Sequence, residues 1–191
     1  METAFKPSME TSSVKVANPK TVRCSDFLLR FVLIVSSAVA ITVLAVSKQT
    51  EIVPVTVLPN LPPIMVEAVA KWQYISAFVY LMVVNCIALV YGTLSVVLSM
   101  MNRGRSNGVA LLLIILDLVV MALLISATGA AAAVGLIGYH GNSHLQWKKV
   151  CNVFGSNCNH VAASTVLTLL GAKALFLLII VSVVNLHKRS H

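Results

Sequence analysis

The 191-residue chain is 58% hydrophobic and only 10% charged. A soluble domain of this size carries about 25% charged residues, so water could not solvate the surface that this composition would expose. The formal net charge of +8 comes from scattered Lys and Arg, without the basic runs and interleaved aromatics of a nucleic-acid surface. The composition therefore argues against a soluble enzyme and against nucleic-acid binding, and it predicts an integral membrane protein whose first partner is the lipid bilayer.

Four segments are long and apolar enough to cross a bilayer as helices. A hydrocarbon core about 30 Å thick requires roughly 20 apolar helical residues. The segments that meet this requirement are 27–46, 72–101, 109–134 and 163–186. They predict an all-α membrane protein, a four-transmembrane-helix antiparallel bundle over residues 27–189. The polar segment 1–26 is expected to be a disordered cytoplasmic leader, and the first span to act as a signal anchor.

The distribution of Lys and Arg near the helix ends predicts the orientation. One side of the bundle carries Lys6, Lys15, Lys20, Arg23, Arg103, Arg105, Lys188 and Arg189, and the other carries Lys48, Lys71, Lys148 and Lys149. The richer side is predicted to be cytoplasmic, which puts both termini inside and the loops of about 47–71 and 138–162 outside. Cys151 and Cys158 then lie in an oxidising compartment, where we predict a disulfide between them.

The two outer loops differ in composition. The first contains Pro54, Pro59, Pro62 and Pro63, which rule out a regular helix through its middle, and its β-branched stretch 51–58 is compatible with an extended chain. The second contains three histidines, His140, His144 and His160, within a Gly- and Asn-rich segment. We interpret it as a solvated loop and predict no metal site.

Three ionisable residues fall inside the predicted spans, where a charge is costly unless it is paired. Measured from the cytoplasmic helix ends, Arg30 lies about 5 Å deep and Asp117 about 12 Å deep, which makes a structural ion pair between them sterically feasible. A transport or proton-relay role and a neutral carboxyl remain open for Asp117, and snorkelling to the interface remains open for Arg30. Lys173, about 20 Å deep, could also reach Asp117 as a third charge, but no partner is assigned to it.

Small and polar residues predict how the helices pack. Asn85 is expected to make an interhelical hydrogen bond. Ala88 with Gly92 in the second span, and Ser126 with Ala130 and Ala127 with Ala131 in the third, have the small-xxx-small spacing that lets backbones approach closely. Packing within one chain and an oligomer seam both remain open for these residues. No GxSxG, HExxH or P-loop motif is present, so we predict no catalytic residue and no cofactor.

Several short segments occur along the chain in the same order as in the sequence pattern of one plant protein family. They are Phe27–Leu28–Leu29–Arg30–Phe31, Ser47–Lys48–Gln49–Thr50, Ala70–Lys71–Trp72–Gln73–Tyr74, Leu116–Asp117–Leu118–Val119, Trp147 with Cys151, Phe154–Gly155 and Cys158, and Leu186–His187–Lys188–Arg189. In this pattern the chain resembles the Casparian strip membrane domain proteins.

The resemblance implies a four-helix plasma-membrane protein related to the MARVEL group. An arginine in the first helix and an aspartate in the third are hallmarks of the family, and they match Arg30 and Asp117. Founding members form immobile membrane platforms that guide local cell-wall modification, so the implied partners are homo- and hetero-oligomers with related family members and secreted cell-wall enzymes. The Val- and Pro-rich segment 52–65 lacks the short signature of the founding members, which indicates a CASP-like paralogue.

Two functional hypotheses follow. The first is a non-catalytic scaffold that oligomerises in the plasma membrane and recruits partners. The second is a small oligomeric transporter or channel that uses Asp117 and Lys173. A transporter usually has more spans per chain or an inverted repeat, so the sequence favours the scaffold.

Overall fold

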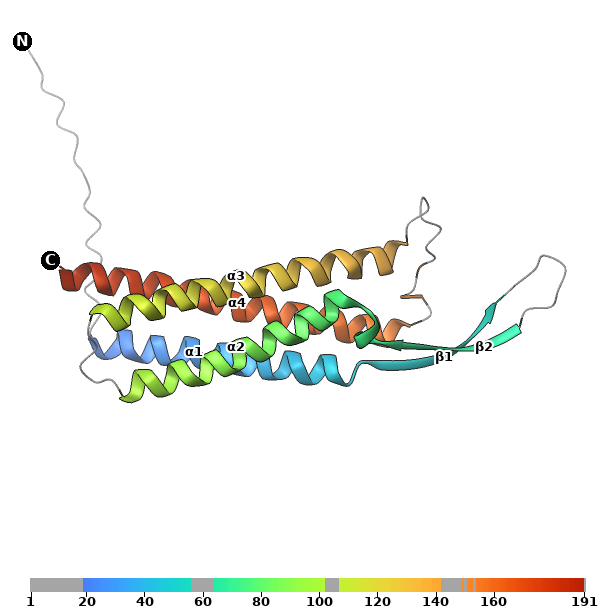
Figure 1. The fold of residues 1–191 in the computed structure, drawn as a ribbon, viewed down its shortest axis with the longest axis horizontal. Helices are drawn as coiled ribbons and strands as arrows, with labels where there is room; N and C mark the ends of the chain where they lie inside the picture. Colours follow the sequence, from blue (N-terminus) through green and yellow to red (C-terminus); the bar gives the residue numbers. More distant parts are fainter. Residues whose placement is uncertain are drawn as a thin grey trace, which may run out of the picture.

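A computed structural model describes residues 19–55, 64–101, 107–141, 149, 151–152 and 154–190. Its framework is a bundle of four long helices, α1 (Pro19–Ala45), α2 (Ser76–Met101), α3 (Asn107–His140) and α4 (Gly155–Ser190) (Figure 1). Each helix is long and apolar enough to cross a membrane. The predicted four-helix membrane bundle is therefore confirmed. Residues 1–18 of the predicted disordered leader, and His144 and Trp147 of the second loop, lie outside the described residues.

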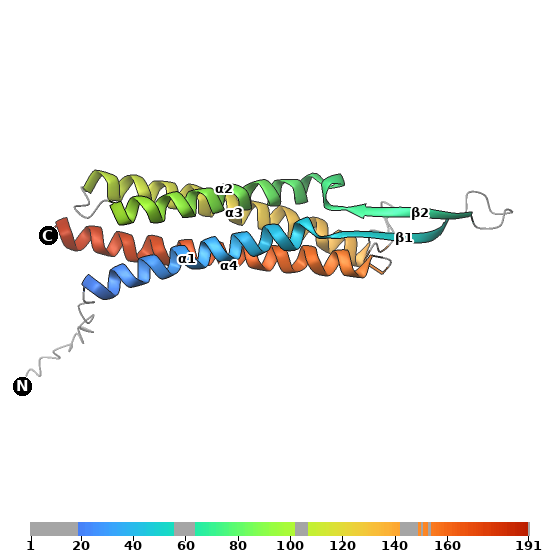
Figure 2. The same cartoon turned by 90° about the horizontal axis from the view of Figure 1, so that it is seen from below.

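The four helices occupy the corners of a square. α1 packs against α2 and α4, and α3 packs against the same two helices. Figures 1 and 2, which are turned by 90°, show these neighbours side by side in the two views. α1 and α3 therefore face each other across one diagonal, and α2 and α4 across the other. We call the end of the bundle with the start of α1 and the end of α4 the terminal end, and the opposite end the hairpin end.

The helices extend further than the apolar spans alone predict. α1 begins at Pro19 rather than near residue 27, α3 continues to His140 rather than 134, and α4 begins at Gly155 rather than 163. Proline suits the first position of α1, because the first turn of a helix needs no backbone donor there. Hydropathy marks only the apolar part of a span, whereas backbone hydrogen bonding continues through the polar turns at its ends.

A β-hairpin connects the first two long helices, in the loop where the sequence was compatible with an extended chain. β1 (Lys48–Val55) pairs antiparallel with β2 (Ile64–Lys71), in a register that runs from Lys48 opposite Lys71 to Val55 opposite Ile64. The predicted extended stretch is thus a strand as far as Val55, and residues 56–63 lie outside the described part. A 3-10 turn, Trp72–Tyr74, follows β2, and for this reason α2 begins at Ser76 rather than at 72. The hairpin projects beyond the bundle (Figure 2).

The core holds leucines from all four helices at full burial. Leu33 and Leu44 on α1, Leu81 on α2, Leu124 on α3 and Leu175 on α4 are at most 1% exposed. Because lipid is as apolar as leucine, association of the helices depends on close packing and polar contacts more than on the hydrophobic effect.

Two glycines set how closely α1 approaches its neighbours. A Cβ on Gly92 of α2 would lie 2.9 Å from Cγ1 of Ile34, and one on Gly171 of α4 would lie 3.0 Å from Oγ of Ser36. A side chain at either position would require its neighbour on α1 to shift. The absence of a side chain at these two positions therefore permits the close approach of α1 to α2 and α4.

Candidate functional site: two polar contacts across the bundle core

The first polar contact is an ion pair across the α1–α3 diagonal. Arg30 and Asp117 are each 1% exposed. The guanidinium donates from Nη1 to Asp117 Oδ1 at 3.4 Å and from Nη2 to Oδ2 at 3.3 Å. The two parallel bonds form a fork that fixes the relative orientation of both groups. The structure thus brings together the two residues that the sequence proposed as a pair.

Two further residues complete this site, and the sequence did not single them out. Tyr91 of α2 donates its hydroxyl proton to Asp117 Oδ1 at 2.6 Å, and its oxygen also lies 3.3 Å from the carbonyl of Leu113. Asp26, one turn before Arg30 on α1, accepts a long hydrogen bond from Arg30 Nε at 3.5 Å. We call Arg30, Asp117, Tyr91 and Asp26 the ionic site; it connects α1, α2 and α3.

The greater length of α1 changes the expected depth of Arg30. At 1.5 Å per residue, Arg30 lies about 16 Å from the start of α1 at Pro19, and Asp117 about 15 Å from the start of α3 at Asn107. The expected depth of about 5 Å for Arg30 was therefore too shallow. Since the two residues share one level of the core, the arginine needs no long reach, and its burial excludes snorkelling into the interface.

The second polar contact crosses the α2–α4 diagonal. Asn85 donates one amide hydrogen to Thr168 Oγ1 at 2.9 Å and the other to the carbonyl of Leu81 at 2.8 Å. Thr168 in turn donates to the carbonyl of Ser164 at 2.8 Å, and Ser164 donates to the carbonyl of Ala40 on α1 at 3.0 Å. The Asn85–Thr168 contact lies about 9 Å nearer the hairpin end than Tyr91, measured along α2.

In both contacts, the buried polar side chains form hydrogen bonds that join one helix to another. Asp117 accepts from Arg30 and Tyr91, and Asn85 has both amide hydrogens bonded. Buried polar groups are costly when they lack partners and are stable when they have them. The arrangement is suited to holding four helices in register, and each buried side-chain nitrogen or oxygen of Arg30, Asp117, Asn85 and Thr168 has at least one hydrogen-bond partner.

Lys173 does not join the ionic site. The sequence placed it within reach of Asp117, but its side chain is exposed on the outer surface of α4, and among the described residues it makes no ion pair or hydrogen bond. The depth of Lys173 along α4 is compatible with a contact to Asp117. Its side chain, however, lies on the outer side of α4, away from the core that contains Asp117. The possible third charge is therefore not part of the ionic site that the described residues form.

The small residues divide between the core and the surface. Ala88 and Gly92 are buried in α2, as are Ala127 and Ala131 in α3. Ser126 is exposed and Ala130 is half-buried, and the hydroxyl of Ser126 lies 3.5 Å from that of Tyr80. The first two pairs therefore pack within the chain, whereas the predicted pair Ser126 and Ala130 does not face the core.

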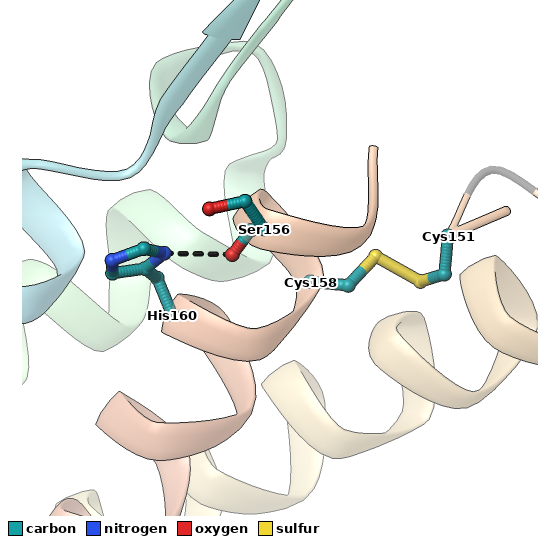
Figure 3. Close-up of a disulfide and its surroundings, with 4 residues drawn as sticks. All are labelled: Cys151, Ser156, Cys158 and His160. Carbon is teal, nitrogen blue, oxygen red and sulfur yellow. Dashed lines mark hydrogen bonds between the residues drawn. A yellow bond between two sulfur atoms is a disulfide. The ribbon is translucent and has the colours of Figure 1, made fainter. Parts of the chain in front are cut away.

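A disulfide stands at the hairpin end. Cys151 and Cys158 are bonded, with Cα atoms 5.7 Å apart, which confirms the predicted pair (Figure 3). The backbone N–H of Cys151 donates to the carbonyl of Gly138 on α3 at 3.3 Å, while Cys158 lies in the first turns of α4. The bond therefore ties the second loop to the ends of two helices.

The chain turns out of α3 at Gly141. This residue has a φ of 71°, in the left-handed region that glycine adopts freely, and its N–H donates to the carbonyl of Ile137 at 2.9 Å. The glycine thus closes the last turn of α3 and starts the loop that the disulfide holds.

The described histidines of this end do not form a metal site. His160 Nδ1 lies 2.7 Å from the carbonyl of Ser156, one turn back on α4, and His140 stacks edge-on against Tyr139 (Figure 3 shows His160). Within the described ranges, no three His, Cys, Asp or Glu side chains are grouped so that they could hold a metal ion. Local contacts account for both rings.

Four membrane-spanning helices held by a buried Arg–Asp pair define the class: a multi-pass membrane protein of the four-helix type. Residues 19–174 match the Casparian strip membrane protein domain, and the chain belongs to this family. It is 49% identical over 177 residues to CASP-like protein 1E2 of Glycine max, covering 93% of this chain and 95% of the relative. It is 46% identical to CASP-like protein 1E2 of Vitis vinifera, over 99% of this chain and 100% of the relative.

A third relative, CASP-like protein 1E1 of Arabidopsis thaliana, is 44% identical over 84% of this chain and 85% of its own length. No solved structure matches the chain. The match confirms the resemblance to this family that was drawn from the sequence.

Proposed function

We propose that the protein is a non-catalytic scaffold that self-assembles in the plasma membrane and presents its hairpin end to partners outside the cell. The observation that carries the proposal is that the buried polar side chains of the two core contacts bond to one another across the bundle. The ionic site and the Asn85–Thr168 contact both join helices on opposite corners of the bundle. Such contacts hold a fixed shape, as a scaffold requires, and they engage the buried polar side chains of these two contacts in joining helices.

The hairpin supports the second half of the proposal. Its strands continue directly from α1 and lead through a 3-10 turn into α2, so the hairpin is anchored at both ends in the bundle. Ile52 and Met65 are 69% and 68% exposed, and both edges of the two-stranded sheet lack a strand neighbour within the described residues. Exposed edges and apolar side chains are the features that bind further strands or proteins. Secreted cell-wall enzymes are the partners we propose for this surface.

The orientation is part of the same proposal. The end of α4 carries Lys188 and Arg189, and the start of α1 carries Lys20 and Arg23, which favours a cytoplasmic terminal end. A disulfide at the hairpin end suits an oxidising, extracellular compartment. Both features favour the same orientation.

The alternative, an oligomeric transporter or channel using Asp117 and Lys173, has less support. Asp117 is buried and paired, whereas Lys173 is exposed on the outside of α4, so the two do not line one path within the chain. An apolar groove of about 400 Å³ on the surface of α2, lined by Cys86, Ile87, Val90, Tyr91 and Leu94, also lacks the charges that an ion path requires.

Native mass in a mild detergent, corrected for bound detergent, tests the proposal. A discrete multiple of 20.4 kDa is the expected result. A clean monomer that supports ion flux in liposomes, with the flux lost in Asp117→Asn, would replace the scaffold with the transporter. The matched control is Asn159→Asp, which alters charge in the exposed first turns of α4 and should leave both mass and flux unchanged.

A further inference from the structure

Lys173 differs in its environment from Arg30 and from the two lysines of the hairpin. Arg30 is buried against two carboxylates, and Lys48 and Lys71 belong to the hairpin. Lys173 is exposed in the middle of α4 and makes no ion pair or hydrogen bond within the described residues. A lysine at this place therefore requires its own physical account.

The side chain is directed away from the bundle. At 3.6 residues per turn, residues one and two turns from Lys173 share its side of the helix. These are Val166, Leu170, Leu177 and Ile180, which are 58%, 47%, 51% and 45% exposed. The opposite side of α4 carries Thr168, Leu175 and Leu178, which are about 1% exposed. Lys173 thus occupies the centre of an apolar strip, which we call the Lys173 face (Val166, Leu170, Lys173, Leu177 and Ile180).

Lys173 also lies at the depth where a charge is most costly. It is midway between Val161 and Asn185, the ends of the apolar stretch of α4, and roughly 18 Å from each at 1.5 Å per residue. Its four-carbon stem covers less than half of that distance, so snorkelling cannot bring the ammonium to the interface. A lone lysine at the centre of a membrane helix is unfavourable, and such residues pair with another group or face water.

We propose that the Lys173 face binds a transmembrane helix of another protein that carries a carboxylate at the same depth. A carboxylate is the group that complements an ammonium, and their attraction is strongest where water is absent. The apolar residues above and below Lys173 supply the packing surface along which such a helix lies. The charge pair then specifies both the partner and its vertical register.

A second copy of this chain cannot supply the carboxylate from the described residues. Asp117 is buried and already paired with Arg30, Asp26 lies near the terminal end of α1, and Glu51 and Glu67 belong to the hairpin. Copies inserted in the same orientation place equal residues at equal depths, so two Lys173 faces would bring ammonium against ammonium. The inference therefore does not rest on the self-assembly proposed above, and either can fail without the other.

Fluorescence energy transfer in liposomes tests the inference with defined probes. The full chain is reconstituted with a synthetic single-span Leu/Ala helix that carries one central Asp, and in parallel with the same helix carrying Asn or Leu instead. We expect the Asp helix to associate about tenfold more tightly than the Leu helix. Lys173→Leu should remove this preference and Lys173→Arg should keep it. Equal association of the Asp and Leu helices with the unaltered chain would overturn the inference.

Two controls make the result specific. Moving the Asp two turns along the probe should abolish the preference, because the charges no longer meet at one depth; an unchanged preference would contradict a register-specific contact. The reversed pair, Lys173→Asp with a central-Lys helix, should restore association, and it keeps the test decisive even if Lys173→Leu alters folding. A change in the oligomeric mass of the chain on Lys173→Leu would also overturn the inference. It would show that a second copy of this chain, and not another protein, binds the Lys173 face.

Discussion

The two diagonals of the bundle are joined by different chemistry at different levels. The α1–α3 diagonal is joined by a buried charge pair with a tyrosine hydroxyl on the carboxylate, and the α2–α4 diagonal by a neutral amide–hydroxyl contact. Both contacts fix helix register, but loss of a partner has unequal consequences. A buried charge left unpaired is strongly unfavourable, whereas a neutral group within a helix bundle finds other partners at small cost. The ionic site should therefore dominate folding.

The largest expected effect is that of Arg30→Met. It leaves Asp117 buried without its counter-charge, and we expect a loss of about 4 kcal/mol in the free energy of unfolding. Detergent-titration unfolding of the purified protein measures it. Val32→Met, on the exposed side of the same helix, is the matched control and should change little.

Gly92→Val should have the second-largest effect on the free energy of unfolding. The new side chain would meet Ile34, one turn from Arg30, and would push α2 away from α1 at the level of the ionic site. Overpacking of this kind costs about 2–3 kcal/mol. Gly129→Val is the matched control, because a Cβ there meets no atom within 4 Å. Equal melting temperatures for the two variants would show that the close approach of α1 and α2 contributes nothing.

Tyr91→Phe removes one hydrogen bond to a buried carboxylate and keeps the ring. We expect a loss of about 2 kcal/mol, because bonds to charged groups exceed those between neutral groups. Tyr80→Phe removes a hydroxyl whose hydrogen-bond partner among the described residues is the exposed Ser126 at 3.5 Å, and it should lose far less. If both substitutions lowered the melting temperature equally, the ionic site would not include Tyr91.

Asn85→Leu should have the smallest effect. Interhelical hydrogen bonds between neutral groups in membrane proteins average about 0.6 kcal/mol, and leucine preserves most of the volume. Thr168→Val should cost a similar amount, and the double variant no more than either single one. A loss as large as that of Arg30→Met, in the same unfolding measurement, would remove the distinction between the two diagonals.

The sequence was sufficient for the spans, the disulfide and the family, because each depends on composition or on a local pattern. It also identified Arg30 and Asp117 as a pair, since a membrane core leaves few alternatives for opposite charges. It misplaced the depth of Arg30, because hydropathy does not mark the polar first turns of α1 that begin at Pro19.

Tyr91 and Lys173 show what a span pattern leaves undetermined. Tyr91 lies one turn beyond Ala88 on the buried side of α2, so the spacing of Asn85 and Ala88 was the signal that could have found it. For Lys173, depth alone left a contact with Asp117 open. Only the packing of α4 against α1 and α3 decides which side of that helix faces lipid.

The central claim, that Arg30 and Asp117 stabilise the fold by direct pairing, is tested most directly by a double-mutant cycle. Arg30→Met, Asp117→Leu and the double variant are compared with the unaltered protein by detergent-titration unfolding. Direct pairing predicts that the double variant is more stable than either single variant, by about 2 kcal/mol or more, because it buries no unpaired charge. A double variant whose loss equals the sum of the two single losses would contradict the claim.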